Sequence, residues 1–484
     1  MKLDNAKLFV TKSYIDGAWV GSDSGATFDV TNPVDDSVIA QVADLGRAEV
    51  ARAIDAAHAA QAGWAAKLAS ERYSIMMEWY RLIMANQEDL AKIITAEMGK
   101  PLKESRGEVA YGASFIQWFA EEAKRVYGDT IPQHQNDKRI VVIKQPIGVV
   151  GSITPWNFPL AMITRKLAPG LAAGCTCVAR PAELTPLTAL ALAELAEKAG
   201  FPKGVFNVVT GSDSSAMGKE LCENDKVRKI TFTGSTRVGS ILMEQCASTI
   251  KKMSLELGGN APFLVFDDAD IDEAIEGAII CKFRNAGQTC VCANRIYVQA
   301  GVYDEFAAKL AKRVAQMTVG NGLDEGTDIG PLISENAIKK VKEHLDDAVS
   351  KGATVIQGGG ESDKGGTFFN PTVVTGVTQD MKVAQEETFG PMAPLFKFET
   401  EEEGIRLAND TIFGLAAYYY TRDIGRVWRV GEALEYGIVG LNTGLISTEV
   451  APFGGVKQSG LGREGSKYGI EEYLEIKYMC MGGI

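Results

Sequence analysis

The sequence predicts an α/β protein built around parallel sheets. Between residues 140 and 260, short apolar segments with strand character alternate with helical segments, which is the pattern of a parallel sheet with crossover helices. Helical segments and apolar segments follow one another again after residue 260. A chain of 484 residues is too long for one hydrophobic core. We therefore expect two or three domains.

The first hundred residues predict short strands followed by helices. Residues 13–45 alternate apolar and polar positions between turn signals, which indicates strands. From Arg47 to Glu97, apolar residues recur at helical spacing. Gly99 and Pro101 end this region, because glycine is favoured just after a helix and proline cannot continue one.

The next segment predicts a parallel sheet of the dinucleotide-binding kind. Thr185 and Pro186 are residue types favoured at the N-cap and first position of a helix, and that helix would end at Gly200. The expected strands occupy residues 140–145, 148–155, 205–209 and 229–233. In the second half, helices are expected near 270–284, 303–316 and 335–351, followed by a Gly-rich loop at 358–366.

Composition excludes several classes of partner. The formal net charge is −12, so no basic surface is expected for nucleic acids or anionic membranes. The most apolar segment, residues 167–178, is too short to span a bilayer. The first residues contain no apolar signal segment, and eight cysteines scattered over this length do not form a disulfide framework. We therefore expect a cytoplasmic protein.

Histidine is too rare for the usual metal sites. His58, His134 and His344 are remote from one another in the sequence and have no nearby ligand pattern. We expect no metal centre, and any catalytic base should be a carboxylate.

Cys290 lies in a run of small and polar residues instead of an apolar segment. Gly287, Gln288 and Thr289 precede it. A thiol beside amide groups and free backbone N–H groups is suited to attack a carbonyl carbon and to hold the resulting oxyanion. The alternative is a small buried cysteine in a turn.

Two further residues favour such chemistry. Asn157 lies between two prolines that fix the backbone, so its amide would be a rigid hydrogen-bond donor for an oxyanion. Glu256 precedes Gly258 and Gly259, which allow the backbone to approach a ligand closely, and a carboxylate there is suited to activate water. The alternatives are an asparagine that satisfies a turn and a solvated surface glutamate.

The turn at 234–239 joins a predicted strand to a helix, where backbone N–H groups and the helix dipole suit a phosphate. Arg180 and Glu183 follow another predicted strand, at the edge where α/β proteins bind ligands. The alternatives are a plain strand–helix turn and a solvated ion pair.

Taken together, these segments resemble the aldehyde dehydrogenase superfamily, and most closely its bacterial succinate-semialdehyde dehydrogenases. The similarity runs in order through nearly the whole chain. The motifs that carry it are TPWNFP, FTGSTRVG, MSLELGGNAP, FRNAGQTCVCANR, QEETFGP and APFGGVKQSGLGREG.

The resemblance implies the aldehyde dehydrogenase fold. It has a Rossmann-like NAD(P)-binding domain (1–124 and 144–254), an α/β catalytic domain (255–466) and a small β oligomerisation arm (125–143 and 467–484). It also implies a homodimer or homotetramer.

The implied reaction is oxidation of succinate semialdehyde to succinate with NAD(P)+ in 4-aminobutyrate degradation. Cys290 would form a thiohemiacetal and then a thioester, Asn157 and the Cys290 N–H would hold the oxyanion, and Glu256 would activate water. The alternative substrate is glutarate semialdehyde, one methylene longer, which sequence does not separate cleanly.

The resemblance also implies binding residues. Arg180 favours the 2′-phosphate of NADP, whereas Glu183 would repel it and favours NAD, so the preference stays open. The substrate, an ω-carboxy aldehyde, would contact Phe158, Arg165, Arg284, Ser447 and Phe453. The cofactor would contact Thr154, Pro155, Trp156, Arg180, Ala182, Glu183, Gly211, Thr233, Gly234, Ser235, Val238, Leu257, Glu387 and Phe389.

Cys292 stands two residues after the implied nucleophile. In relatives such a pair can form an inactivating disulfide, so Cys292 is a redox candidate. The alternative is a small cysteine that only packs.

Overall fold

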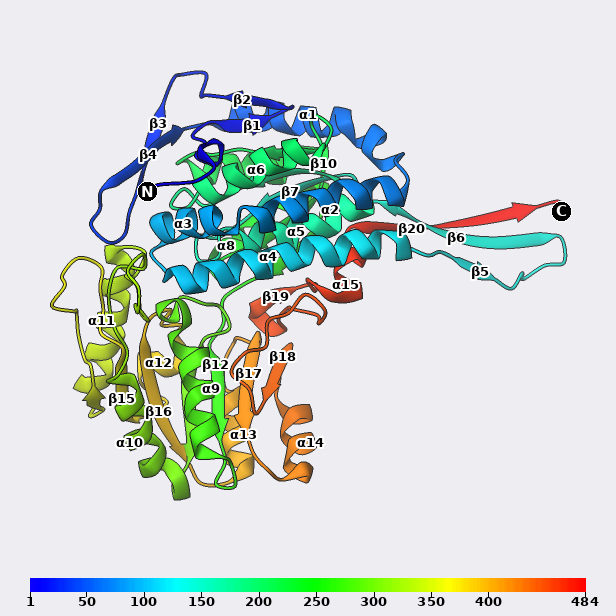
Figure 1. Cartoon of the computed structure of the whole chain (residues 1–484). Coiled ribbons are helices and arrows are strands. Elements are labelled where there is room, and N and C mark those ends of the chain that lie inside the picture. Colours follow the sequence, from blue (N-terminus) through cyan, green and yellow to red (C-terminus); the bar gives the residue numbers. More distant parts are fainter.

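The computed structural model describes all 484 residues, and its first half is organised around an eight-stranded sheet (Figure 1). The strand order is β19-β11-β10-β7-β8-β9-β1-β2. The strands from β11 to β9 are parallel, whereas the outer strands pair antiparallel. The strands are β1 (Ser13–Ile15), β2 (Ala18–Val20), β7 (Val149–Ile153), β8 (Thr176–Arg180), β9 (Phe206–Val208), β10 (Val227–Thr233), β11 (Lys252–Glu256) and β19 (Gly460–Leu461).

Alternating side chains of these strands build a core on each face of the sheet. Val149 and Ile153 pack with residues of α1, α7 and α8, while Val150 and Cys177 pack with residues of α2 to α6. The helices are α1 (Arg47–Ala65), α2 (Ala69–Ala85), α3 (Gln87–Met98), α4 (Leu102–Glu122), α5 (Ala161–Ala173), α6 (Leu187–Ala199), α7 (Ser214–Glu223) and α8 (Thr236–Cys246). The predicted helical region between Arg47 and Glu97 is therefore confirmed, and Gly99 ends it with a φ of 93°.

The start of α6 differs from the sequence prediction. The helix begins at Leu187, with Pro186 as N-cap, and no side chain of Thr185 or Pro186 caps it. Instead, the buried carboxylate of Glu97, at the end of α3, accepts hydrogen bonds from the N–H groups of Leu187 (2.8 Å) and Thr188 (3.0 Å). A residue 90 positions away thus satisfies donors that a local cap would otherwise serve.

The second half of the chain forms a seven-stranded sheet with the order β14-β15-β16-β13-β12-β17-β18. All neighbours are parallel except β14 and β15. Its strands are β12 (Ala261–Val265), β13 (Ala293–Gln299), β14 (Thr354–Gln357), β15 (Thr372–Val377), β16 (Met392–Phe398), β17 (Ala416–Tyr420) and β18 (Ile438–Leu441). Its helices are α9 (Ile271–Phe283), α10 (Tyr303–Val314), α11 (Glu335–Ser350), α12 (Lys382–Gln385), α13 (Glu401–Asn409) and α14 (Ile424–Ala433).

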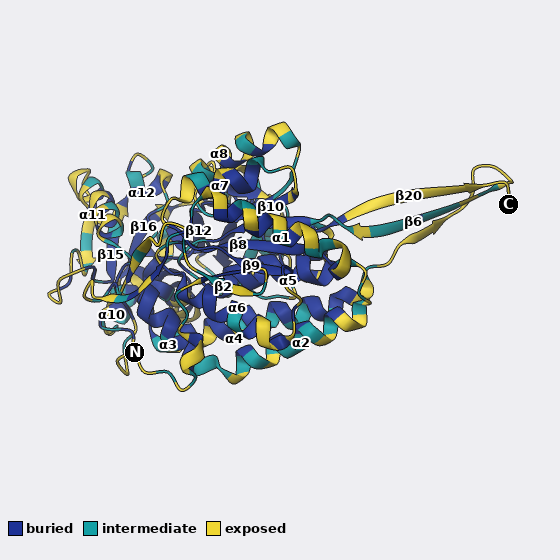
Figure 2. Ribbon diagram, turned by 90° about the horizontal axis from the view of Figure 1, so that it is seen from above, coloured by how far each residue is buried: buried dark blue, intermediate teal, exposed yellow.

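A three-stranded sheet extends away from the body of the molecule (Figures 1 and 2). After α15 (Ser466–Glu471), β20 (Leu474–Gly482) pairs antiparallel with β6 (Lys138–Pro146), with Leu474 opposite Pro146 and Gly482 opposite Lys138. The other neighbour of β6 is β5 (Asp129–Ile131). The strand predicted at 140–145 therefore lies in this sheet. A separate hairpin joins β3 (Thr27–Thr31) to β4 (Val38–Ala43).

None of the helices combines the length and the apolar character that a membrane crossing requires.

The parallel sheet of the first half places several chain segments side by side. Thr233 at the end of β10 pairs with Glu256 at the end of β11, and β7 leads directly into the segment that carries Asn157. Carboxyl ends of parallel strands are where α/β proteins hold ligands. Cys290 and Glu387, from the second half, line a cavity at this edge.

Candidate active site

Two cavities meet at Cys290. One, of about 280 Å³, is lined by residues of α4, α5 and the loops around Arg284 and Ser447. The other, of about 370 Å³, is lined by the Pro155–Trp156 segment, the start of α8 and the Glu387–Phe389 segment. Asn157, Thr233 and Cys290 line both cavities. The site can therefore present one thiol to two different molecules.

The loop before Cys290 is held in an uncommon backbone conformation. Asn285 and Ala286 have φ values of 53° and 54°, and residues other than glycine adopt this region at a cost of about 1–3 kcal/mol each. Glu104 of α4 accepts a hydrogen bond from the Asn285 N–H (2.8 Å), and the Asn285 amide donates to the Asn157 carbonyl (3.1 Å). These contacts fix the loop against the opposite wall of the site.

The segment that carries Asn157 is also fixed by hydrogen bonds to buried side chains. The fully buried ammonium of Lys100 donates to the Asn157 carbonyl (2.7 Å) and to Glu108 (2.6 Å). Glu108 in turn accepts from the N–H of Leu160 (2.9 Å). The Asn157 amide donates one hydrogen to the Gln288 carbonyl (3.0 Å), which leaves its second hydrogen free.

Cys290 is half-buried where the two cavities meet, and Glu256 is buried. Burial raises the pKa of the Cys290 thiol to about 12, with Arg165 opposing the shift. Burial, and then Glu464, raises the pKa of Glu256 well above its usual value, and one of its carboxylate oxygens has no hydrogen-bond partner. A raised pKa makes the ionised carboxylate a stronger base, which suits proton transfer to and from water.

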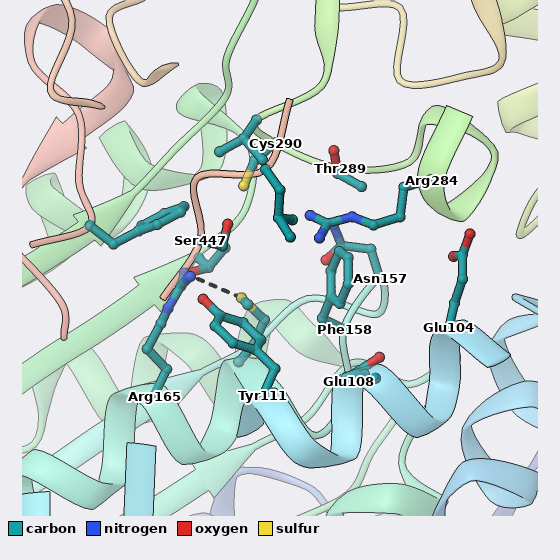
Figure 3. A pocket seen from close by; sticks show the side chains of 16 residues that line it. Glu104, Glu108, Tyr111, Asn157, Phe158, Arg165, Arg284, Thr289, Cys290 and Ser447 are labelled. Carbon is teal, nitrogen blue, oxygen red and sulfur yellow. Dashed lines mark hydrogen bonds between the residues drawn. The ribbon is translucent and has the colours of Figure 1, made fainter. Parts of the chain in front are cut away.

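Arg165 and Arg284, the two arginines expected to bind the substrate carboxylate, differ in their ion-pair partners. Arg165 forms an ion pair with Glu464, which also accepts a hydrogen bond from Lys166 (2.5 Å). One buried carboxylate thus serves both the Arg165 and the Lys166 cations. Arg284 has no ion-pair or hydrogen-bond partner for its guanidinium, which lies 5.5 Å from the centre of the Phe158 ring and faces the smaller cavity (Figure 3).

All five predicted substrate contacts line the smaller cavity. Sequence reasoning missed the contribution of α4: Glu104, Glu108 and Tyr111 share one face of that helix and form a wall of the cavity (Figure 3). Their spacing of four and three residues was the available signal. The predicted contacts are Phe158, Arg165, Arg284, Ser447 and Phe453, and the other missed residues are Gly107, Met162, Thr289, Val291 and Leu445.

Most predicted cofactor contacts line the larger cavity. Burial raises the pKa of Glu387 to about 7, and its carboxylate accepts a hydrogen bond from the Gly259 N–H (3.2 Å). Phe389 has a φ of 56° and packs edge-on against Trp156, with 5.6 Å between the two ring centres. The predicted residues there are Pro155, Trp156, Thr233, Gly234, Ser235, Leu257, Glu387 and Phe389, and the missed ones include Leu184, Ser334, Asn336, Ala337 and Lys340.

Six predicted cofactor residues line neither cavity. Arg180 pairs with Glu183 (2.9 Å) and donates to the Gly211 carbonyl (3.2 Å). Val238 N–H donates to Ser235, the N-cap of α8 (3.3 Å), and the Thr154 N–H donates to the Arg180 carbonyl (3.1 Å). The six are Thr154, Arg180, Ala182, Glu183, Gly211 and Val238.

The polar groups around the larger cavity fit a dinucleotide. The Thr233 hydroxyl, which lines the larger cavity, is buried without a hydrogen-bond partner. The Arg180 Nε and the Thr154 hydroxyl also lack partners, but their residues line neither cavity. The start of α8, with Gly234 and Ser235, opens onto the larger cavity, and a helix N-terminus is suited to a phosphate.

Cys292 is separated from the cavities. Its sulfur accepts a hydrogen bond from the Lys282 ammonium (3.3 Å) and donates to the Lys282 carbonyl (3.4 Å), and the side chain is fully buried. A disulfide with Cys290 would require the Cys292 sulfur to leave these contacts. The redox role of Cys292 stays a prediction.

Comparison with known proteins agrees with this geometry. Residues 19–479 match the aldehyde dehydrogenase family. The sequence is 62% identical over 482 residues to succinate-semialdehyde dehydrogenase (NADP(+)) of Escherichia coli (strain K12), with 100% of each chain covered. It is also 62% identical over 484 residues to glutarate-semialdehyde dehydrogenase of Pseudomonas aeruginosa, again with 100% of each covered. The crystal structure of succinate-semialdehyde dehydrogenase from Burkholderia pseudomallei, 60% identical, matches the fold with a TM-score of 0.99 over 100% of both chains. The chain therefore belongs to the aldehyde dehydrogenase family.

Proposed function

We propose that this enzyme oxidises succinate semialdehyde to succinate with NAD(P)+. The observation that carries the substrate proposal is the unpaired guanidinium of Arg284 in the same cavity as Cys290. Arg284 is half-buried, its guanidinium has no protein partner, and the ω-carboxylate of the substrate would pair with it. Ser447, in the same cavity, adds a hydroxyl donor.

The proposed reaction begins at the junction of the two cavities. The Cys290 thiol gives its proton to solvent water as its sulfur bonds to the aldehyde carbon, and the carbonyl oxygen becomes the oxyanion of a thiohemiacetal. Its oxyanion receives hydrogen bonds from the Asn157 amide and from the Cys290 N–H, which donates to no protein group. NAD(P)+, when bound in the larger cavity, would supply the acceptor for the hydride of this carbon, and a thioester on Cys290 would remain. Glu256 then takes a proton from water, and the hydroxide hydrolyses the thioester to the acid and the free thiol.

The cofactor would be held by residues of both halves of the chain. In this proposal Ser235 and the first N–H groups of α8 bind the pyrophosphate, Glu387 accepts from the nicotinamide ribose hydroxyls, and Phe389 packs on the ring. Arg180 and Glu183 would lie at the adenosine ribose. Because Arg180 is paired with Glu183, the repulsion between this carboxylate and a 2′-phosphate is reduced, and we propose that both NAD and NADP are accepted.

Glutarate semialdehyde is the second candidate. Two of the relatives at 62% identity are named for it, so overall identity does not separate the two substrates. Both carry an ω-carboxylate, and one methylene changes discrimination by roughly 10–200-fold.

The test is steady-state kinetics with succinate semialdehyde, glutarate semialdehyde and butanal, using wild type and Arg284→Met. Loss of the guanidinium removes a hydrogen bond to a charged group, so kcat/KM for both acid aldehydes should fall roughly 10–150-fold, with little change for butanal. Arg106→Met, on the exposed face of α4, is the matched control. Equal losses on butanal, or no loss on the acid aldehydes, would remove the substrate proposal and leave the family assignment intact.

We further propose the domain division 1–124 with 144–254, 255–466, and 125–143 with 467–484. The last pair of segments would form an oligomerisation arm of a homodimer or homotetramer. The exposed β20 supports this role, since a long edge strand is normally covered. Because Cys290 must stay a free thiol to act, we place the enzyme in the cytoplasm.

A further inference from the structure

The hydroxyl of Tyr111 is an unused polar group in the cavity that holds Arg284. Tyr111 lies on α4, and its hydroxyl oxygen is buried without a hydrogen-bond partner. Figure 3 shows this hydroxyl pointing from the α4 wall into the cavity, on the side opposite Cys290 and close to the Arg165 guanidinium. A buried hydroxyl without a partner costs free energy in the empty enzyme, so its natural partner should be a ligand.

The neighbours of Tyr111 determine which hydrogen-bonding role is left to it. Arg165 carries only donors, so it can face the tyrosine oxygen but cannot accept the hydroxyl hydrogen. Glu108, one turn earlier on α4, is occupied by Lys100 and by the N–H groups of Leu160 and Ala161. No hydrogen bond of the structure uses the Tyr111 hydrogen, so it is available to a ligand in the cavity.

Burial raises the pKa of Tyr111, with Arg165 opposing the shift, so the hydroxyl keeps its hydrogen at neutral pH. It is then a neutral donor, and its best partner is an anionic acceptor. The oxyanion at Cys290 already has the Asn157 amide and the Cys290 N–H as donors. The ω-carboxylate at the other end of the substrate can accept several hydrogen bonds, so it has room for a donor in addition to Arg284 and Ser447.

We propose that the Tyr111 hydroxyl donates a hydrogen bond to the ω-carboxylate of the substrate, beside Arg284 and Ser447. This inference rests on the proposed function and deepens it. In this arrangement Arg284 supplies an unpaired charge, while Tyr111 and Ser447 supply neutral donors that fix the orientation of the carboxylate. An uncharged aldehyde would leave the tyrosine hydroxyl unpartnered, so Tyr111 selects for the acid.

Tyr111→Phe tests this proposal, because it removes one oxygen and keeps the ring that packs in the cavity. The variant and wild type are assayed with succinate semialdehyde and with butanal. The expected result is a roughly 10–100-fold lower kcat/KM for succinate semialdehyde, mostly through KM, with butanal nearly unchanged. Tyr127→Phe, an exposed tyrosine outside both cavities, is the matched control and should behave as wild type.

Three other outcomes would overturn the inference, and they separate it from the proposed function. If Tyr111→Phe keeps the wild-type kinetics while Arg284→Met loses activity on the acid, Tyr111 has no role and the substrate proposal stands. If the variant loses activity equally on both aldehydes, Tyr111 only packs. If wild type does not prefer the acid aldehyde to butanal, the proposed function fails and the Tyr111 inference fails with it.

Discussion

Single residues in this site owe their properties to distant partners. Cys290, Glu256 and Asn157 lie in sequence motifs, so their chemistry was predictable from local residue types. Arg165 and Arg284 looked equivalent in the sequence, and only the fold shows that Arg165 is paired with Glu464, 299 positions away. Tyr111 belongs to no motif. Its role depends on which groups α5 and the Arg284 loop place around it, and that information exists only in three dimensions.

Glu387 should make cofactor binding depend on pH. Burial raises its pKa to about 7, so the carboxylate is ionised above that pH and protonated below it. The ionised form accepts hydrogen bonds from the ribose hydroxyls, and protonation removes part of this capacity. We expect KM for NAD(P)+ to rise as the pH falls through 7, measured at saturating aldehyde. In Glu387→Gln this dependence should be absent, and an unchanged profile in that variant would contradict the assignment.

Glu183 should govern the choice between NAD and NADP. Its carboxylate is partly exposed and pairs with Arg180. Glu183→Gln removes a negative charge and frees the guanidinium for a 2′-phosphate, so kcat/KM for NADP+ should rise about tenfold relative to NAD+. Glu194→Gln, which alters an ion pair on the neighbouring helix α6, is the control. A ratio that stays at the wild-type value would show that neither residue reaches the ribose.

At the scale of elements, periodicity predicted the helices well and failed at one helix end. Apolar spacing placed the segments that became α1 to α3 and α9 to α11, because each carries apolar residues at helical spacing that pack into a core. The start of α6 was wrong by one residue, since Thr185 has the usual type for a local cap and the actual acceptor is Glu97. When the capping residue belongs to another helix, the sequence around the helix start does not reveal it.

Glu97 should therefore stabilise α6 from outside. Replacing it with alanine leaves the N–H groups of Leu187 and Thr188 buried without acceptors, and we expect the free energy of unfolding to fall by about 1–3 kcal/mol. Denaturant unfolding of the two forms measures this difference. Glu88→Ala, an exposed position on the same helix α3, should cost less than about 0.5 kcal/mol. Equal effects at both positions would show that the long-range cap contributes nothing specific.

At the scale of the whole molecule, the two sheets and the arm have separate tasks. Each sheet has its own core, and the reactive groups come from both halves at the edge between them. The resemblance to a known family supplied the arm, which composition and periodicity alone did not reveal. The pairing of β20 with β6 spans more than 300 residues of sequence, which no local pattern encodes.

The arm gives a test of assembly. Ile476 and Tyr478 are 70% and 57% exposed on the same face of β20, and apolar side chains on an unprotected edge strand favour association with another copy. We expect wild type to form dimers or tetramers in light scattering coupled to size exclusion. Replacing both residues with lysine should yield monomers, because a desolvated charge is costly in an interface. Leu68→Lys, equally exposed but on the body at the start of α2, should leave the assembly unchanged. A wild type that elutes as a monomer would contradict the arm's proposed role, and a lysine variant that keeps the wild-type mass would place the interface elsewhere on the molecule.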